Sequence, residues 1–552
     1  MEVMKECKFV LHAPVMEGVE DDIHYIKEII HHPDGRKEPN FKPLVNFKRP
    51  FWITKPHFQN HSDKKESETL ERLNKYTSTQ NSLHINIASR LGPRYIGAKS
   101  MRDVVNSPYL YGTDIDSRAV IKKMYIDKYP DAVSANKLVV LDIEANIETD
   151  EMIIISIASH EEVYVAILDN FIPNKRNLEE QLMYLYKQHI PKTELNSKIQ
   201  PVFEVFKTEM EMLESVLNRL HKMKPDFVAV WNIDYDIPFL IKVCERNKVD
   251  PKDIFSDPSI PKELRYFNYK QGKKVKLTES GVHKPISPEE QWHIVQTPCS
   301  WYWIDAMSTH RYVRVGGKVV SGGYSLNNIL EKELGKDMKK LKFEDDMSDG
   351  LIGADWHKYM VANKPLEYII YNAWDTMSVL ELDNKTKDLS NTISVLIGWS
   401  SYDIFDSGPK KIIDALHFFY IDNGRVLGVK GTKEKEEEDL GLSNWIAILD
   451  SDAVPESKLD VLKEKGLQHN IRGNTSDLDA VSSYPSDTRA ANVSKDTTSR
   501  TIIDIQGIEK LNFMLQNINL FFGKVNSGEY CNNMLNMPSL REIETILRNK
   551  DK

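Results

Sequence analysis

The sequence predicts an α/β (α+β multidomain) protein, and three observations support this fold class. The chain has 552 residues, which is too long for one ordinary domain. Continuous apolar runs of strand length, typical of buried strands, lie at 137–142, 151–159, 161–168 and 224–232. Segments with helical apolar spacing follow at 237–249 and 366–387. Strands interspersed with helices favour a sheet that helices cover.

Composition and charge indicate several apolar cores and no membrane segment. The chain is 41% hydrophobic and 28% charged, and no apolar run approaches the roughly 20 residues that span a bilayer. Its first residues carry charges but lack the long apolar stretch of a secretory signal. A net charge of −9 argues against a simple nucleic-acid coating protein, which would be basic. We therefore expect a cytoplasmic protein with no membrane partner.

The cysteines and histidines predict neither a disulfide framework nor a zinc site. The four cysteines lie far apart, without C-x-x-C spacing: Cys7, Cys244, Cys299 and Cys531. Such thiols are expected to be reduced. His57 and His61 have i, i+4 spacing, but no further ligand accompanies them and no H-E-x-x-H is present. They are interpreted as scaffold or surface histidines.

The first part of the chain leads into a central sheet. Residues 1–130 mix short strand-like stretches with a charged, turn-rich segment. The character changes at Lys137, where three apolar runs follow one another at hairpin spacing and predict a three-stranded meander. The run at 224–232 predicts a further buried strand, and the helix at 237–249 should pack on it.

Two more helices are predicted after the sheet. The apolar spacing of 366–387 predicts an amphipathic helix, and 410–424 predicts a helix that stops at Gly424. The segment GYSLNNILEKELGKDMKKLKFED (323–345) is assigned no chemistry.

Carboxylates lie at places where these elements can converge. Asp142 and Glu144 stand at the end of the first buried strand, and their i, i+2 spacing puts both side chains on one face. Asp236 follows the strand at 224–232, while Tyr371 and Asp375 are four residues apart on a predicted helix. Two divalent ions about 4 Å apart can hydrolyse a phosphodiester, and such ions prefer hard oxygen ligands. A tyrosine hydroxyl beside Asp375 could orient the attacking water.

Each of these patterns has an ordinary structural interpretation when taken alone. D-x-E after a strand is commonly a turn or a helix cap, and Y-x-x-x-D on a helix is common at surfaces and in packing. An acidic pair that directly follows four apolar residues is nevertheless costly unless cations or donors satisfy it. The three patterns together, in this order, favour a metal-dependent nuclease.

The three segments resemble the Exo I, Exo II and Exo III motifs of family B DNA polymerases. The first reads D-x-E, the second N-x-x-Y-D and the third Y-x-x-x-D; the matching residues are Asp142, Glu144, Asn232, Tyr235, Asp236, Tyr371 and Asp375. The resemblance implies a ribonuclease-H-like 3′→5′ exonuclease domain that holds two Mg²⁺ or Mn²⁺ ions. It implies Asp142, Glu144, Asp236 and Asp375 as ligands, with Tyr371 positioning the water. Asn232 and Tyr235 would contact DNA, and Asp234 is interpreted as a surface or turn residue.

A basic, aromatic segment lies between the second and third motifs. RYFNYKQGKKVKL (265–277) interleaves aromatic residues with Lys and Arg around a glycine. It predicts a β-hairpin whose lysines, Lys273 and Lys274 among them, contact phosphates while its rings stack on frayed bases. An ordinary solvated hairpin explains the same pattern equally well.

The segment DLDAVSSYPS resembles motif A of the family B polymerase palm. The spacing D-x-x-S-x-Y-P-S selects Asp479 as the acid, and Ser483 stands where the family usually has Leu. The resemblance implies that Asp479 ligates catalytic metal. It also implies that Ser482 and Ser483 lie at the triphosphate of a dNTP, and that Tyr484 lies under the incoming sugar.

The other parts of a polymerase site are missing from this sequence. No D-x-D follows motif A, and KVNSGEY (524–530) does not fit the K-x-x-x-N-S-x-Y-G fingers signature. Since two-metal phosphoryl transfer needs at least one more carboxylate, this chain is not expected to polymerise DNA alone. Two interpretations stay open: one chain of a split polymerase, as known among tailed bacteriophages and favoured here, or a truncated product that keeps the nuclease.

The resemblance implies four regions and a role in replication. These are an N-terminal domain (1–130), an exonuclease domain (131–385), a connecting segment that returns to the N-terminal domain (386–465) and a partial palm (466–552). The expected function is proofreading in the cytoplasm of an infected bacterial host cell. The expected partners are DNA, a second polymerase chain and, among replication proteins, a sliding clamp. The alternatives are an assembly subunit with vestigial metal sites and a standalone single-strand nuclease.

Overall fold

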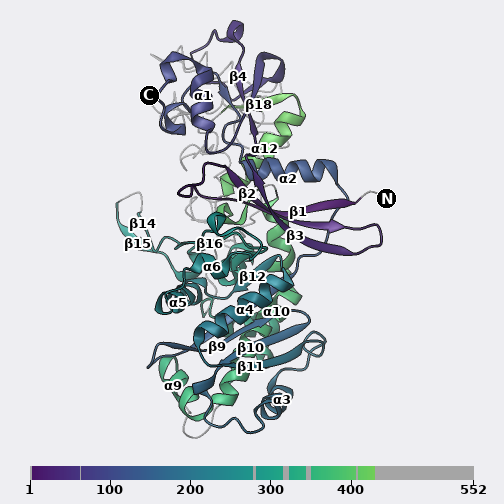
Figure 1. Cartoon of the computed structure of the whole chain (residues 1–552), viewed down its shortest axis with the longest axis vertical. Helices are drawn as coiled ribbons and strands as arrows, with labels where there is room; N and C mark the ends of the chain where they lie inside the picture. Colours follow the sequence, from purple (N-terminus) through teal and green to yellow (C-terminus); the bar gives the residue numbers. More distant parts are fainter. Residues whose placement is uncertain are drawn as a thin grey trace, which may run out of the picture. The chain divides into compact units, whose positions relative to one another are not determined.

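A six-stranded mixed sheet forms the core of the chain in the computed structural model (Figure 1). Its strand order is β11-β10-β9-β8-β12-β17, and the bounds are β8 Leu138–Asn146, β9 Glu151–Ala158, β10 Glu162–Leu168, β11 Gln200–Phe206, β12 Phe227–Val230 and β17 Tyr302–Asp305. β8, β9 and β10 run antiparallel in sequence order, whereas β11 is parallel to β10, and β12 joins β8 and β17 in parallel. The predicted meander and the predicted fourth strand are confirmed.

The structure describes residues 3–428, except 63, 278–280, 315–321, 344–349, 399 and 406–407. The motif A segment with Asp479, Ser482, Ser483 and Tyr484 therefore lies outside the described residues, as does the predicted partial palm (466–552). Among the described helices, none is both long and apolar enough to cross a membrane.

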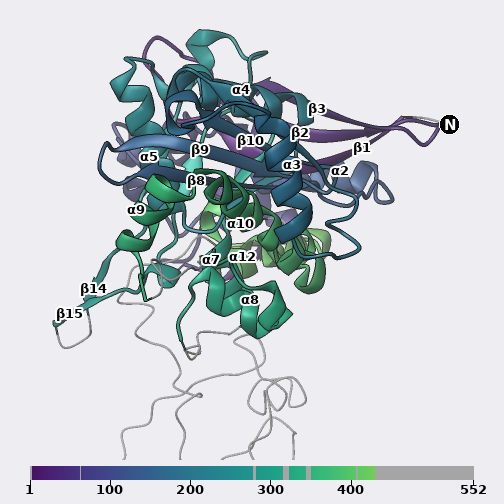
Figure 2. The ribbon, with the colours of Figure 1, turned by 90° about the horizontal axis from the view of Figure 1, so that it is seen from below.

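Helices cover both faces of the sheet. α4 (Glu209–Met223) packs on β9 and β10, while α10 (Pro365–Thr386) packs on β8 and β9. Figure 2 shows these two helices on opposite sides of the strands. This double cover explains why the sheet strands read as continuous apolar runs and not as alternating ones.

The prediction of an amphipathic helix at 366–387 is correct about the helix and wrong about its exposure. Every residue of α10 from Tyr368 to Asp383 is buried. The sheet covers one side of the helix, and α3 (Leu178–His189), α8 (Leu326–Leu334) and α9 (Ala354–Asn363) contact other parts of it. Polar residues inside such a helix must find partners in the protein.

The helix predicted at 237–249 begins four residues earlier than expected. α5 spans Ile233–Arg246 and contains Pro238. Proline lacks a backbone N–H and is best tolerated near the start of a helix, so the sequence pattern suggested that the helix began there. The earlier start places Asp236 within α5.

The N-terminal residues form two small sheets with helices beside them. β1 (Met4–His12), β2 (Ile23–His31) and β3 (Lys37–Val45) form an antiparallel sheet, and β6 (Leu73–Ser78), β4 (Arg49–Thr54) and β7 (Leu110–Tyr111) form another. β5 (Ser67–Thr69) pairs with β18 (Arg425–Leu427), which follows α12 (Gly408–Asp422). The helix predicted at 410–424 is confirmed, and Gly424 adopts a φ of 74° in the turn after it. The remaining helices are α1 Leu83–Leu91, α2 Ser117–Lys128, α6 Pro251–Phe255, α7 Ala306–Arg314 and α11 Ile393–Ile397.

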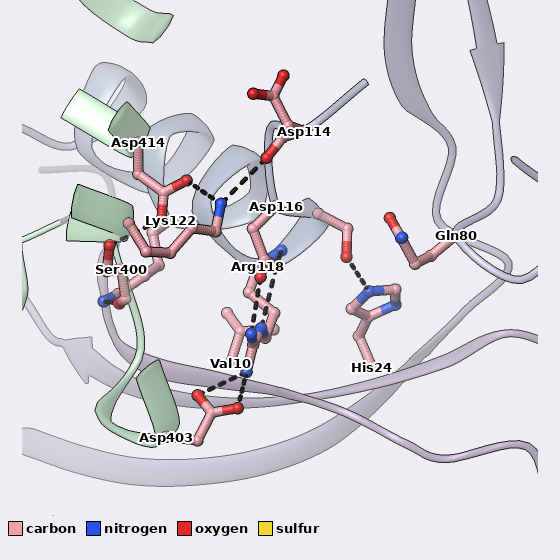
Figure 3. Close-up of polar contacts among 12 residues, drawn as sticks. Val10, His24, Gln80, Asp114, Asp116, Arg118, Lys122, Ser400, Asp403 and Asp414 are labelled. Carbon is pink, nitrogen blue, oxygen red and sulfur yellow. Dashed lines mark hydrogen bonds and ion pairs between the residues drawn. The ribbon is translucent and has the colours of Figure 1, made fainter. Parts of the chain in front are cut away.

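Charged residues of α2 hold the segment that follows α10 (Figure 3). Arg118 donates to both carboxylate oxygens of Asp403 at 2.8 Å and also pairs with Asp116 at 2.7 Å. Lys122 donates to the carbonyl oxygens of Gly398 (2.9 Å) and Ser400 (2.6 Å). These contacts join residues nearly 300 positions apart in the chain.

The single hairpin predicted at 265–277 is replaced by two separate ribbons. β13 (Asn268–Lys270) pairs with β16 (Ile294–Gln296), and β14 (Val275–Leu277) pairs with β15 (His283–Pro285). Each half of the predicted hairpin therefore finds its partner later in the chain. Figures 1 and 2 show the β14–β15 ribbon projecting from the body around the sheet.

Candidate active site

The first two acids come from the middle of the sheet. Asp142 and Glu144 lie on β8, opposite Ser156 and Ile154 of β9 in the antiparallel register. The ladder shifts its register between Glu144 and Ala145, and bulges of this kind are frequent beside active sites. Glu144 is buried and Asp142 is partly buried, so the strand carries two carboxylates into the interior.

The third acid reaches β8 from the neighbouring strand connection. β12 is parallel to β8, with Val230 opposite Leu141, and the chain passes from β12 directly into α5. Oδ1 of Asp236 in the first part of α5 accepts a hydrogen bond from the backbone N–H of Ile143, at 3.3 Å. Asp236 thus lies against the strand segment that carries Asp142 and Glu144.

The fourth acid comes from α10, which crosses β8. Ligand-type oxygens of Asp142, Glu144 and Asp375 lie within 4.8 Å of one another. Tyr371 precedes Asp375 by one helical turn, and both side chains are buried. The structure therefore brings together Asp142, Glu144, Asp236, Tyr371 and Asp375, from three elements that are far apart in the sequence.

All four carboxyl groups have pKa values above their ordinary range. Burial is the main cause in each case, and it raises the pKa of Glu144 to about 8 and that of Asp236 to about 8. The pKa of Asp142 is well above normal because of burial and of the charges on Asp236, Asp375 and Glu144. Burial also raises the pKa of Asp375, although Lys340 opposes this. Four acids that resist ionisation together need added positive charge to become fully ionised.

Lys340 supplies one positive charge, and sequence reasoning missed it. Its Nζ donates to Oδ2 of Asp375 and to the hydroxyl of Tyr371, the latter at 2.8 Å. Burial alone would lower the pKa of Lys340, but the charges of Asp375 and Asp142 help to hold it well above its usual value. Lys340 belongs to the segment 323–345, which was assigned no chemistry. The sequence could not point to this lysine, because no spacing rule connects a loop lysine to acids on a distant strand and helix.

Three further residues on the same side of the site were also missed. The hydroxyl of Tyr368 donates to Oε2 of Glu144, and Nδ1 of His357 lies 2.6 Å from that hydroxyl. Asn372 donates from Nδ2 to Oδ2 of Asp142 at 2.7 Å. A signal for two of them was present, since Tyr368, Asn372 and Asp375 share one face of α10 with Tyr371 at i, i+4 and i+7 spacing. His357 on α9 had no comparable signal.

Asn232 and Tyr235, which are expected to contact DNA, lie at the start of α5, close to Asp236 in the chain. Asn232 is the residue before α5 and makes no capping hydrogen bond with its side chain. Tyr235 is 52% exposed, so its ring faces solvent beside the acids. Asp234 points elsewhere, because it accepts a hydrogen bond from Tyr269 at 2.8 Å and pairs with Lys274 at 3.1 Å. Asp234 is therefore outside the acid cluster, but it fixes the segment between β13 and β14 and is not a simple surface residue.

The two lysines of that segment differ. Both lysines are exposed, but Lys274 also forms an ion pair with Asp234. The ribbon that follows is exposed on both strands, including Val275 and Leu277. The structure therefore places the two lysines beside a projecting ribbon.

The acid cluster fits divalent cations. Oδ1 of Asp375 is buried and has no hydrogen-bond partner in the described part of the chain, and the neighbouring donor set consists of carboxylate oxygens, which Mg²⁺ and Mn²⁺ prefer. Lys340 neutralises one of the four acids. The other acids, once ionised, leave negative charge at a buried position, and divalent ions would compensate it.

Comparison with protein families agrees with this chemistry. Residues 119–276 match the family model described as the exonuclease domain of DNA polymerase family B. The match includes Asp142, Glu144 and Asp236 and ends before Lys340, Tyr371 and Asp375. No curated protein matches the chain. The family match supports a DNA-binding exonuclease domain of this family, whose members use divalent metals.

Proposed function

We propose that this chain removes nucleotides from the 3′ end of DNA as the proofreading exonuclease of a family B DNA polymerase. The observation that carries the proposal is the convergence of Asp142, Glu144, Asp236 and Asp375 in one buried cluster. Buried carboxylates whose pKa values are raised by burial and by one another's charges are typical of functional positions. The family match at 119–276 supports the same activity.

The acids hold the ions, and the neighbouring residues orient the acids. Asp142, Glu144, Asp236 and Asp375 are the metal ligands, for two Mg²⁺ or Mn²⁺ ions. When bound, these ions supply a water made nucleophilic at neutral pH and charge stabilisation at the leaving oxygen. Asn372 and Tyr368 fix the orientation of Asp142 and Glu144 through the hydrogen bonds described above.

Tyr371 and Lys340 prepare the position of the attacking water. The Tyr371 hydroxyl accepts a hydrogen bond from Lys340, so its own proton can point away from the lysine toward a water. The Lys340 ammonium adds positive charge where negative charge develops on the phosphate. A positioned charge in a site that excludes water is effective because it needs no reorganisation during the reaction.

DNA reaches the acids over the exposed side of α5. Tyr235 offers a ring on which a terminal base can stack. Asn232 contacts the same nucleotide, while Lys273 and Lys274 contact phosphates near the β14–β15 ribbon. Such lysine contacts bind without sequence preference and weaken as salt rises.

The polymerase part of the proposal depends on residues outside the described structure. Asp479 would ligate metal at a palm site, with Ser482, Ser483 and Tyr484 at the incoming dNTP. No D-x-D pattern and no K-x-x-x-N-S-x-Y-G fingers signature follow motif A within the 552 residues. We propose that a second chain supplies them and that the regions are 1–130, 131–385, 386–465 and 466–552. The pairing of β18 with β5 agrees with a segment that returns to the N-terminal region.

The test uses the purified chain, Mg²⁺ and a single-stranded oligonucleotide labelled at its 5′ end. Stepwise shortening from the 3′ end is expected with the wild-type chain and not with Asp142→Ala/Glu144→Ala. Glu245→Gln is the matched control, since it removes an exposed carboxylate from the far end of α5, away from Asp236. Shortening by the double variant would contradict the ligand assignment.

The same assay separates the alternatives. Absence of shortening with Mg²⁺ or Mn²⁺, alone and with a candidate second chain, would favour an assembly subunit with vestigial sites. Full activity that no second polymerase chain alters would favour a standalone nuclease. Nucleotide incorporation that appears only when both chains are mixed, and disappears with Asp479→Ala, would support the split polymerase.

A further inference from the structure

A second group of potential metal ligands lies in the N-terminal sheet, apart from the acid cluster. His12 ends β1 and His24 lies on β2, and the two residues are direct partners in the antiparallel register. Asp22 immediately precedes β2. One potential ligand atom from each of these three residues lies within 4.8 Å of the other two.

His24 has a nitrogen that the protein leaves unsatisfied. The residue is 0% exposed, and its Nε2 lies 2.8 Å from the Ser117 hydroxyl at the start of α2. Figure 3 shows the His24 ring beside Gln80 with this one hydrogen bond drawn. Its other nitrogen, Nδ1, is buried without a hydrogen-bond partner among the described residues. If Nε2 carries the proton and donates to Ser117, the free lone pair on Nδ1 is available to a ligand.

Asp22 is held in the way that metal-ligating carboxylates are held. Its Oδ2 accepts hydrogen bonds from the backbone N–H groups of Gln80 (2.6 Å) and Asn81 (3.4 Å). Its Oδ1 faces Nε2 of His12 at 2.6 Å. Hydrogen bonds to one oxygen of a ligating carboxylate fix its orientation and leave the other oxygen for the ion.

An ordinary ion pair between His12 and Asp22 explains only part of this arrangement. It accounts for the short contact between those two residues, but it gives no partner to Nδ1 of His24. The rings of His12 and His24 lie 4.6 Å apart between centroids, so both imidazoles border the same small space. An ion between them would satisfy all three side chains.

We propose that His12, Asp22 and His24 bind one first-row transition-metal ion, with zinc as the first choice. Two imidazole nitrogens and one carboxylate oxygen suit zinc, whereas Mg²⁺ and Ca²⁺ prefer sites made of oxygens alone. Bonds of about 2.0 Å in a tetrahedral arrangement would bring the ligand atoms to about 3.3 Å from one another. A cavity of 360 Å³ is lined by His12 and by Gln80 and Ser117, the hydrogen-bond partners of Asp22 and His24, so a water in it could approach the ion from the side of His12.

The ion would have a structural role. His12 and Asp22–His24 belong to the first sheet, the amides of Gln80 and Asn81 belong to the loop after β6, and Ser117 begins α2. Binding would tie these three parts together. Because the folded form alone presents the complete site, zinc should raise the melting temperature of the chain.

The test counts zinc on the full-length chain in an Asp142→Ala/Glu144→Ala background, so that the exonuclease acids do not contribute. After treatment with a chelator, one equivalent of zinc is added, and the protein is dialysed against excess Mg²⁺. Bound zinc is then measured by elemental analysis, with Co²⁺ as a spectroscopic substitute that gives an intense visible band when four-coordinate. We expect one retained zinc per chain and a higher melting temperature.

Three variants make the test specific. His12→Gln removes a partly exposed ligand and should abolish retention. Ser117→Ala keeps all three ligands and should weaken zinc binding by about 10- to 100-fold. His31→Gln, at the other end of β2, is the matched control and should bind zinc like the parent. Circular dichroism of the metal-free variants checks that each is folded.

Two outcomes would overturn the proposal. One is a parent chain that retains no zinc and gives no cobalt band. The other is zinc retention that His12→Gln and Ser117→Ala leave unchanged, which would place the ion elsewhere in the chain. If His12→Gln does not fold, Ser117→Ala decides the question alone, since the serine is not a ligand.

Discussion

At the scale of single residues, the acid cluster consists of four carboxyl groups that the fold buries close to one another. Asp142, Glu144, Asp236 and Asp375 all have raised pKa values because burial disfavours their ionised forms. Lys340 is a cation at the centre of the group. An arrangement that is unfavourable without divalent ions becomes favourable when they bind, so metal affinity and protonation are coupled.

We expect Mg²⁺ affinity to rise steeply with pH up to about 8. Glu144 and Asp236 have pKa values of about 8, so Mg²⁺ must displace their protons at lower pH. Each displaced proton changes the affinity about tenfold per pH unit. Titration calorimetry at pH 6.5 and 7.5, in buffers of different ionisation enthalpy, measures both the affinity and the protons released.

The metal-free protein should show the opposite trend in stability. Between the unfolded pKa near 4.5 and the folded value of about 8, the folded chain binds more protons than the unfolded chain. Its free energy of unfolding therefore falls as pH rises through this window. Asp142→Ala/Glu144→Ala should flatten both trends. An affinity for Mg²⁺ that is independent of pH in the wild-type chain would contradict the raised pKa values.

Replacing Lys340 by methionine should slow hydrolysis without weakening metal binding. The substitution removes the ammonium that contacts Asp375 and Tyr371. Loss of one positioned charge lowers a chemical rate by about 100-fold, whereas loss of a competing cation leaves the acids free for divalent ions. Single-turnover rates at saturating Mg²⁺ and calorimetric Mn²⁺ affinities separate these two effects.

Lys339→Met is the matched control for that measurement. Lys339 is the preceding residue, but its side chain pairs with Glu331 at 2.6 Å, away from the acids. It should retain the wild-type rate. Equal rates for Lys340→Met and Lys339→Met would mean that Lys340 only balances charge in the metal-free protein.

At the scale of elements, α10 combines packing and chemistry because protein surrounds it. One face carries Tyr368, Tyr371, Asn372 and Asp375 toward β8, and residues on its other faces are also buried. The polar groups on these buried faces find partners, for example Ser378, whose hydroxyl donates to the carbonyl oxygen of Asp375 at 2.9 Å. The rigidity of such a helix helps to keep the acid and the tyrosine in register with the strand acids.

Met377→Ala tests the buried environment of α10. Met377 is 0% exposed and lies close to the Tyr186 hydroxyl on α3, at 3.5 Å from sulfur to oxygen. Truncation of a fully buried methionine costs about 2–5 kcal/mol of unfolding free energy, and denaturant unfolding measures this loss.

Asn384→Ala, on an exposed position of the same helix, is the control and should change the free energy of unfolding by less than about 0.5 kcal/mol. Similar losses in both variants would contradict the all-round burial of α10 up to Asp383.

At the scale of the whole described chain, buried charges join sequence-distant segments. Arg118 on α2 forms a bidentate contact with Asp403, which follows α10 by some twenty residues. Both side chains are largely buried, at 11% and 14% exposed. In such pairs the loss of one partner is costly because the other charge is left without compensation.

A double-mutant cycle at Arg118 and Asp403 should show strong coupling. Arg118→Leu alone is expected to lower the free energy of unfolding by about 3–5 kcal/mol, since it leaves Asp403 and Asp116 as buried unpaired carboxylates. Adding Asp403→Leu should recover part of this loss. Urea unfolding of the four proteins gives the coupling energy.

The surface pair Lys198 and Glu194, which is mostly exposed on both sides, serves as the control cycle and should show a coupling of about 0.5 kcal/mol or less. Additive effects at Arg118 and Asp403 would mean that the contact does not join the two segments in solution.

The sequence by itself determined the strands and helices that carry the acids, and it selected the acids. Apolar runs mark β8 and β12 because burial on both faces requires continuous apolar residues. The spacings of Asp142 with Glu144 and of Tyr371 with Asp375 are local, and local backbone geometry fixes which side chains share a face. These features could therefore be predicted without a fold.

Only the tertiary structure decided which other groups meet them. Lys340 and His357 reach the acids, and His24 reaches Ser117, through contacts between segments with no fixed separation in the chain. The full burial of α10 likewise depends on what packs nearby. The same holds for β13 and β14, which pair with β16 and β15 and not with each other. Periodicity indicates which kind of element a segment forms, but how much of the element is buried, and by which partners, depends on how the chain folds back on itself.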